Sequence, residues 1–186
     1  FRQEPSRPLT LKKPRKPLKK TPITAKTRNN INPLREKAGR NFSEKKMIEY
    51  IDEAPTLEEY KEMRRAVNFM VLSDRIASNA LNNAFHITTV RDNGRAIGMI
   101  RVLSDGSYAN FITDVMVIPE YQRRGIGREM MHRTIDFMYG TLEKGETIVL
   151  YLMSASGREQ FYKQFGFRER PNEVWGAGMS QWITKK

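Results

Sequence analysis

After residue 46, stretches in which apolar residues recur with the period of a helix follow stretches with the period of a strand. Thr56 followed by Glu59 forms a capping-box pattern, which predicts a helix that runs to about Phe69. Three further helices are predicted, and the last of them is expected to be capped by Ser156 and ended by a left-handed Gly166. The predicted helices span residues 57–69, 74–81, 128–139 and 157–165.

Segments rich in alternating β-forming residues predict strands joined by tight turns. The pairs Asn93-Gly94 and Asp105-Gly106 are typical of turns between antiparallel strands, so three consecutive strands are expected to form a meander. The predicted fold class is therefore α/β (α+β), with helices that flank a mostly antiparallel sheet. The predicted strands span residues 47–51, 85–91, 96–103, 109–118, 148–153 and 179–184.

Charge divides the 186-residue chain at about residue 46. Residues 1–46 hold 15 Lys and Arg against three acidic residues, which accounts for the whole net charge of +12, because residues 47–186 hold 18 bases and 18 acids. Proline is frequent in residues 1–46 and apolar residues are few, so we expect a disordered basic arm before a domain of residues 47–186. The arm either makes weak contacts with a nucleic acid or is a solvated tail. Met47 is an alternative start, since the chain opens with Phe1.

Composition limits the chemistry that these elements can carry. The chain has no cysteine, which excludes disulfides, thiol catalysis and cysteine-ligated metal sites. Two histidines, His86 and His132, are too few for a histidine-rich site, so no metal is expected, and His86 is interpreted as structural. The longest apolar run, residues 148–153, is too short to span a bilayer. We expect a cytoplasmic protein without membrane contact.

The segment Q-R-R-G-I-G, residues 122–127, joins a predicted strand to a predicted helix. N–H groups in the first turn of a helix have no partner within the helix, and Gly125 and Gly127 allow a ligand to approach the backbone closely. The helix dipole adds partial positive charge. These features suit a pyrophosphate, although surface arginines beside a glycine turn explain the pattern about as well. The arginines are Arg123, Arg124 and Arg128.

The Q-R-R-G-I-G segment resembles the acyl-CoA loop of the GNAT superfamily of N-acetyltransferases, which reads Q/R-x-x-G-x-G/A after a strand ending in V-x-P. Residues 161–167, F-Y-K-Q-F-G-F, are similar to a second family pattern, F-Y-x-x-x-G-F. A branch of small bacterial acetyltransferases is the nearest in pattern, and arylalkylamine acetyltransferases are more distant. The resemblance implies a mixed, mostly antiparallel, twisted sheet of about six to seven strands flanked by about four helices.

The resemblance also implies an activity, the transfer of an acetyl group from acetyl-CoA to a primary amine of a small molecule by direct attack. Two splayed strands would hold the pantetheine arm, and the N–H near Val117 would polarise the thioester carbonyl. N–H groups of residues 122–127 would hold the pyrophosphate. The implied acetyl-CoA contacts are Met116, Val117, Gln122, Arg123, Arg124, Gly125, Ile126, Gly127 and Arg128.

Two residues are candidates for catalysis. Tyr162 matches the family tyrosine that protonates the leaving thiolate, although it could be a core residue instead. Asp114 either accepts a proton or orients the amine, or it is a structural carboxylate bonded to loop N–H groups. Many GNAT sequences carry an Asn where this chain has Ala155, so Ser154 or Ser156 replaces that contact or it is missing.

Other activities remain open at this point. The chain could acetylate protein lysines and recruit an acidic partner through the basic arm. It could also be a non-catalytic acyl-CoA-binding regulatory module whose arm binds nucleic acid. A homodimer is a further alternative. The acceptor is expected to bind at the loops around residues 69–84 and 171–179.

Overall fold

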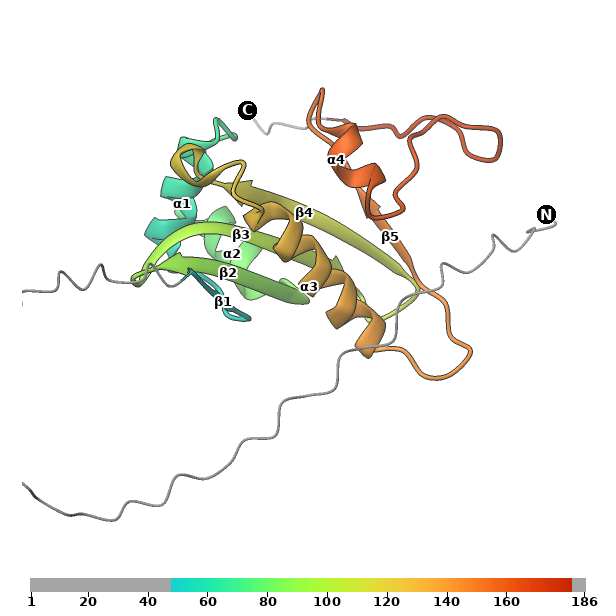
Figure 1. Ribbon diagram of the computed structural model, residues 1–186, viewed down its shortest axis with the longest axis horizontal. Coiled ribbons are helices and arrows are strands. Elements are labelled where there is room, and N and C mark those ends of the chain that lie inside the picture. The colour runs from blue at the N-terminus through green and yellow to red at the C-terminus, as the bar shows by residue number, and fades with distance from the viewer. Residues whose placement is uncertain (1–47, 182–186) are drawn as a thin grey trace, which may run out of the picture. The chain divides into compact units, whose positions relative to one another are not determined.

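The computed structural model describes residues 48–181 (Figure 1). The predicted basic arm lies outside these residues, as does most of the predicted strand at residues 179–184, whose first three residues are irregular. The elements are β1 (Ile48–Ile51), α1 (Leu57–Ala66), α2 (Asp74–Asn82), β2 (His86–Asp92), β3 (Arg95–Ser104), β4 (Ala109–Val117), a 3-10 turn (Pro119–Tyr121), α3 (Ile126–Gly140), β5 (Val149–Leu152) and α4 (Glu159–Lys163).

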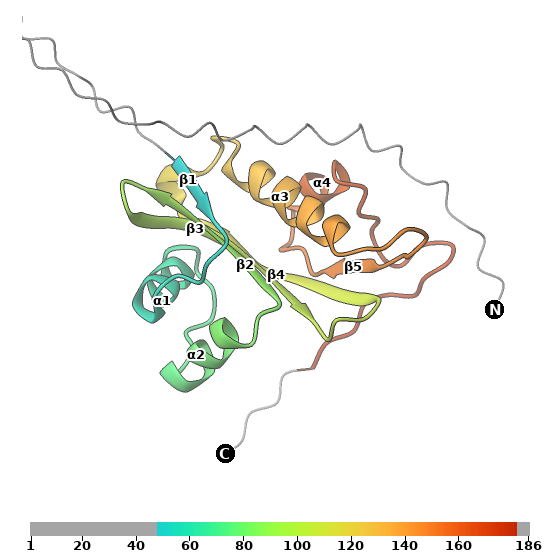
Figure 2. The same cartoon turned by 90° about the horizontal axis from the view of Figure 1, so that it is seen from below.

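The strands form one sheet in the order β1-β2-β3-β4-β5. Neighbours are antiparallel except for β4 and β5, which run parallel. Helices α1 and α2 lie on one face of the sheet, and α3 and α4 lie on the other (Figure 2). The predicted mixed, mostly antiparallel sheet and its four helices are confirmed. Residues 48–181 contain five strands, where six to seven were expected.

The core fills the space between the sheet and the helices on its two faces. Tyr60 and Met63 from α1 are buried on one side, and Met130, Met131 and Met138 from α3 are buried on the other. Burial of these large apolar side chains drives the helices onto the sheet. Among residues 48–181, no helix is long and apolar enough to cross a membrane.

Local signals place most element boundaries. The capping box is present, since the Thr56 N–H donates to Glu59 Oε2 at 2.8 Å and the Glu59 N–H donates to Thr56 Oγ1 at 3.2 Å. The helix α1 ends at Ala66, three residues earlier than predicted, because Asn68 adopts a left-handed conformation with φ of 58°.

The helix α4 is shorter than predicted at both ends, since it spans Glu159–Lys163 and not residues 157–165, but the predicted conformation of Gly166 is confirmed. No side chain caps this helix, which begins at Glu159, because Gly157 takes a positive φ of 78° and turns the chain after Ser156. Gly166 has a φ of 87°, the left-handed conformation that the sequence predicted.

The strand β4 contains a β-bulge at Asp114. Met99 opposes Met116 and Arg101 opposes Thr113, so two residues of β4 lie opposite the single Ile100 of β3. Asp114 has a φ of 50°, a left-handed conformation that aspartate tolerates better than most residues.

The strands β4 and β5 diverge beyond the middle of β4. Their parallel ladder joins residues 109–112 of β4 to residues 149–152 of β5, whereas residues 113–117 of β4 pair only with β3. The second half of β4 therefore has one edge without a strand partner within the described residues. This open edge is the feature around which the candidate site is built.

Candidate active site

The open edge of β4 presents the backbone of Val117. The Ile118 N–H donates to the Ile97 carbonyl of β3 at 2.9 Å. Successive residues of an extended chain direct their N–H and C=O groups to opposite edges, so the Val117 groups point away from β3. The Val117 carbonyl on that side accepts a hydrogen bond from Gln122 Nε2 at 2.9 Å. The N–H of Val117 therefore points to the open edge, and its role as a donor to the thioester carbonyl stays a prediction.

The predicted pyrophosphate loop, residues 122–127, lies between the 3-10 turn and α3. Two residues with positive φ, Arg123 at 60° and Gly125 at 82°, shape it, and Gly125 is the N-cap residue of α3. A side chain at Gly125 would find no atom within 4 Å, so the space beside its Cα is open to a ligand. The first-turn N–H groups of this 15-residue helix are available to an anion.

The side chains of the loop divide into exposed and packed groups. Arg123, Arg124 and Arg128 are exposed, and the Arg124 guanidinium lies 4.8 Å from the centre of the Tyr121 ring. A Cβ on Gly127 would lie 3.4 Å from the Phe161 ring, so this glycine accommodates the ring of α4. The remaining two predicted contacts, Met116 and Ile126, are buried, so they can offer a ligand only backbone groups.

Tyr162 lies on α4, half-buried and packed edge-on against Phe161 and Phe167, with ring centres 5.0 and 6.3 Å away. Within residues 48–181 its hydroxyl has no hydrogen-bond partner from the protein. Burial raises the pKa of the Tyr162 hydroxyl above its usual value of 10.0, and the charge of Arg158 opposes the shift. The hydroxyl is therefore protonated at neutral pH, which is the state a proton donor needs.

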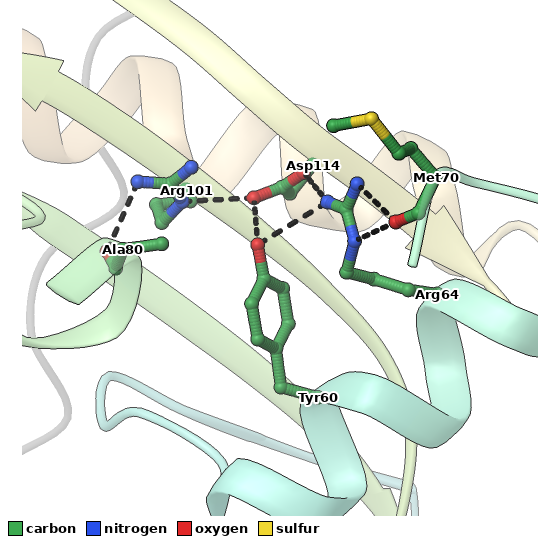
Figure 3. Close-up of polar contacts among 6 residues, drawn as sticks. All are labelled: Tyr60, Arg64, Met70, Ala80, Arg101 and Asp114. Atoms are coloured by element: carbon green, nitrogen blue, oxygen red, sulfur yellow. Dashed lines mark hydrogen bonds and ion pairs between the residues drawn. The ribbon is translucent and has the colours of Figure 1, made fainter. Parts of the chain in front are cut away.

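Asp114 is the centre of a buried charge cluster (Figure 3). Its Oδ1 accepts a hydrogen bond from Arg64 Nη1 at 2.8 Å. Its Oδ2 accepts from the Tyr60 hydroxyl at 2.8 Å and from Arg101 Nε at 2.9 Å. Burial, followed by the charge of Asp114, raises the pKa of Tyr60 above its usual 10.0. Three side-chain donors therefore occupy the carboxylate, where the structural alternative for Asp114 expected loop N–H groups.

Comparison with known proteins identifies the domain that contains these features. Residues 83–169 match the family model of the acetyltransferase (GNAT) domain. Over these residues the chain carries a GNAT acetyltransferase domain. GNAT domains are acyl-CoA-dependent N-acyltransferases.

Relatives of the GNAT domain include algal and bacterial proteins. An uncharacterized N-acetyltransferase, ycf52, of Pyropia yezoensis is 30% identical over 84 residues, which cover 45% of this chain and 46% of that protein. The chain thus spans about half the length of the curated relatives it matches. A probable acetyltransferase from methicillin-resistant Staphylococcus aureus, SA2161, shares the fold with a TM-score of 0.65 at 24% identity, covering 73% of this chain and all of the other. An aminoglycoside N-acetyltransferase in complex with CoA has a TM-score of 0.53 at 13% identity, covering 77% and 98%.

The GNAT domain does not bring its two predicted catalytic residues together. The Asp114 side chain contacts α1, whereas Tyr162 belongs to α4, and these helices lie on opposite faces of the sheet (Figure 2). His86 is structural as expected: it is buried in β2, it stacks on Phe137 with ring centres 3.8 Å apart, and its Nε2 lies 3.1 Å from Thr88 Oγ1.

Sequence reasoning missed the partners of Asp114. The only local signals for them are Tyr60 and Arg64, four residues apart on one helix, and Arg101, a charged residue inside a mostly apolar strand. Residues four apart on a helix share a face, so these signals indicate a buried polar contact without naming the partner.

Proposed function

We propose that this chain transfers the acetyl group of acetyl-CoA to a primary amine of a small molecule. The observation that carries the proposal is the divergence of β4 and β5, which leaves the backbone of residues 113–117 without a strand partner on one edge. An extended pantetheine arm can pair with such an edge as a further strand would. The GNAT domain indicates the class of reaction, and the open edge of β4 is where acetyl-CoA is proposed to bind.

The loop of residues 122–127 is proposed to hold the pyrophosphate of acetyl-CoA. Its backbone donors stand at the positive end of α3, and Arg123 and Arg128 are exposed beside them. The Gln122 side chain donates to the Val117 carbonyl, so one hydrogen bond links the two parts of the proposed site. The residues present therefore fit an anionic ligand whose chain continues along β4.

The proposed chemistry needs one proton donor and one hydrogen-bond donor to the carbonyl oxygen. The neutral amine attacks the thioester carbon, the carbon–nitrogen bond forms and the carbon–sulfur bond breaks. The Val117 N–H stabilises the negative charge that develops on the carbonyl oxygen. Tyr162 gives its proton to the departing sulfur, the amine nitrogen loses its own proton to the solvent, and the solvent returns a proton to Tyr162. The products are an N-acetylated amine and free CoA.

The experiment that tests the proposal is amine-dependent release of the CoA thiol from acetyl-CoA, measured with a panel of primary amines. We expect release that saturates with the amine and yields one acetylated amine for each thiol. Acetyl-CoA binding without release for any amine would instead favour the acyl-CoA-binding module. Acetylation of protein lysines without acetylation of free amines would favour the protein acetyltransferase.

A further inference from the structure

The buried cluster of Tyr60, Arg64, Arg101 and Asp114 joins α1, β3 and β4 (Figure 3). Tyr60 is fully buried, and Arg64 and Asp114 are 9% and 7% exposed. Two guanidinium groups share one carboxylate, so the cluster depends on the single negative charge of Asp114. A buried charge that loses its only counter-charge is strongly unfavourable.

Arg64 extends the cluster to the loop between α1 and α2. While its Nη1 donates to Asp114, its Nε and Nη2 donate to the Met70 carbonyl at 3.1 and 3.0 Å. Its guanidinium carbon lies 5.5 Å from the centre of the Phe69 ring, and the Phe69 N–H donates to the Arg64 carbonyl at 2.8 Å. The planar fork of arginine serves the carboxylate and the carbonyl from different nitrogens held in a fixed geometry. The loop is therefore tied to β4 through one side chain.

The loop that Arg64 holds exposes apolar side chains. Phe69, Met70 and Val71 are 36%, 55% and 70% exposed. Asp114, at the other end of the tie, lies in the β-bulge three residues before Val117. The cluster thus links a loop with exposed apolar side chains to the strand segment that bears the proposed carbonyl donor.

The position of the cluster relative to the sheet indicates which substrate it serves. The pyrophosphate loop and Tyr162 belong to α3 and α4, on one face, whereas the cluster and its loop lie with α1 and α2 on the other (Figure 2). An acyl donor that occupies one side of the open edge leaves the other side for the attacking amine.

We infer that Arg64 and Asp114 are positioning residues for the acceptor amine, since they fix the α1–α2 loop against the bulge of β4. This inference rests on the proposed function. Removal of the tie loosens the loop and weakens use of the acceptor, whereas acetyl-CoA binding stays the same. Use of acceptors with an apolar group next to the amine is weakened most, because the loop exposes apolar side chains.

Two variants of the full chain test the tie. Asp114→Asn removes the charge but keeps the size and the tolerance for a positive φ. Arg64→Lys keeps the positive charge, so the Asp114 carboxylate is not left unpaired. Lysine lacks the planar fork with which Arg64 donates to both the Asp114 carboxylate and the Met70 carbonyl. Arg91→Lys is the matched control, because Arg91 also ties α1 to the sheet by a two-pronged bond to Glu59, at 2.6 and 2.9 Å, away from the loop.

The first measurement is amide hydrogen exchange of residues 67–72, which does not depend on activity. Asp114→Asn and Arg64→Lys should speed exchange at Phe69 at least tenfold over the control, with residues 122–127 unchanged. Unchanged exchange in a folded Arg64→Lys variant overturns the inference, whether or not the protein acetylates any amine.

The second measurement separates the two substrates. In a wild type that turns over an amine, the KM for that amine should rise at least tenfold in Arg64→Lys, while the acetyl-CoA Kd stays within twofold. An equal loss for both substrates, or an unchanged KM for the amine, overturns the positioning role. A wild type that releases no thiol with any amine overturns the proposed function instead, and the exchange result then decides the tie alone.

Discussion

The two faces of the sheet differ in whether their candidate polar groups have hydrogen-bond partners in the protein. On the α1/α2 face, both oxygens of Asp114 are engaged by three donors, all within 2.9 Å. On the α3/α4 face, the Tyr162 hydroxyl is half-buried, and within the described residues no protein group bonds to it. A group whose hydrogen-bonding capacity is used holds structure in place, whereas a partly desolvated group with unused capacity can exchange a proton with a ligand. The difference supports our proposals that one face positions the acceptor and the other carries the chemistry.

The largest effect is expected at Tyr162, on the face proposed to carry the chemistry. Tyr162→Phe should lower kcat roughly 10²–10⁴-fold, the usual contribution of general acid catalysis, and kcat/KM should fall with it. The ring remains, so its packing against Phe161 and the acetyl-CoA Kd should change little. Tyr139→Phe, at an exposed tyrosine of α3, is the control. Near wild-type kcat with chemistry shown to be rate-limiting would return Tyr162 to a structural role.

The proposed pyrophosphate loop, residues 122–127, should show the next largest effect. Gly125→Asp places a carboxylate where the phosphates are proposed to bind, so acetyl-CoA affinity should fall at least tenfold, about 1.4 kcal/mol. Gly145→Asp is a matched control, because Gly145 also has a positive φ and a Cβ added there would meet no atom within 4 Å. Calorimetry of both folded variants decides the question. Equal affinities would mean that the loop does not bind acetyl-CoA.

A smaller effect should appear at the other charged tie of α1. The Arg91 side chain lowers the pKa of Glu59 from 4.5 to about 2, with burial opposing the shift. Because the pKa is lower in the folded state, the pair stabilises the fold above pH 4.5, and this contribution is lost as the pH falls from about 4.5 to 2. Thermal unfolding of wild type and Glu59→Gln should therefore converge over this range, whereas neutral-pH kinetics of the variant should match wild type. If the difference in Tm between wild type and Glu59→Gln stays the same from pH 4.5 to 2, the Arg91–Glu59 pair does not stabilise the fold.

The smallest effect is expected from the basic arm. Deletion of residues 1–46 should change the acetyl-CoA Kd and the turnover of a small amine less than twofold, because residues 47–186 are proposed to form the complete domain. Any affinity of the full chain for DNA or RNA should disappear with the arm and fall steeply with salt. Loss of free-amine acetylation on deletion would show that the proposed boundary is misplaced.

Local features of the fold were predictable because their causes lie close together in the sequence. The capping box at Thr56 and Glu59, the Asn93-Gly94 turn and the left-handed Gly166 each depend on a few neighbouring residues. The loop of residues 122–127 was predictable for the same reason, since a strand, a glycine turn and a helix start follow one another.

Features that depend on distant residues were not predictable. Tyr60 and Asp114 lie 54 positions apart, and nothing near either residue specifies the other. The bulge at Asp114 lies in a predicted strand, residues 109–118, that contains no glycine or proline to mark an irregularity. The partial pairing of β4 with β5 is likewise a property of the assembled sheet, and only the family resemblance indicated it.

The most direct test of the account is a titration of the isotopically labelled protein with acetyl-CoA, followed through its backbone amide resonances. The account predicts that the largest shifts occur at Val117 and at residues 122–127, with small shifts in α1 and α2. Shifts concentrated in α1, α2 and the loop between them would contradict it, because acetyl-CoA would then occupy the face assigned to the acceptor.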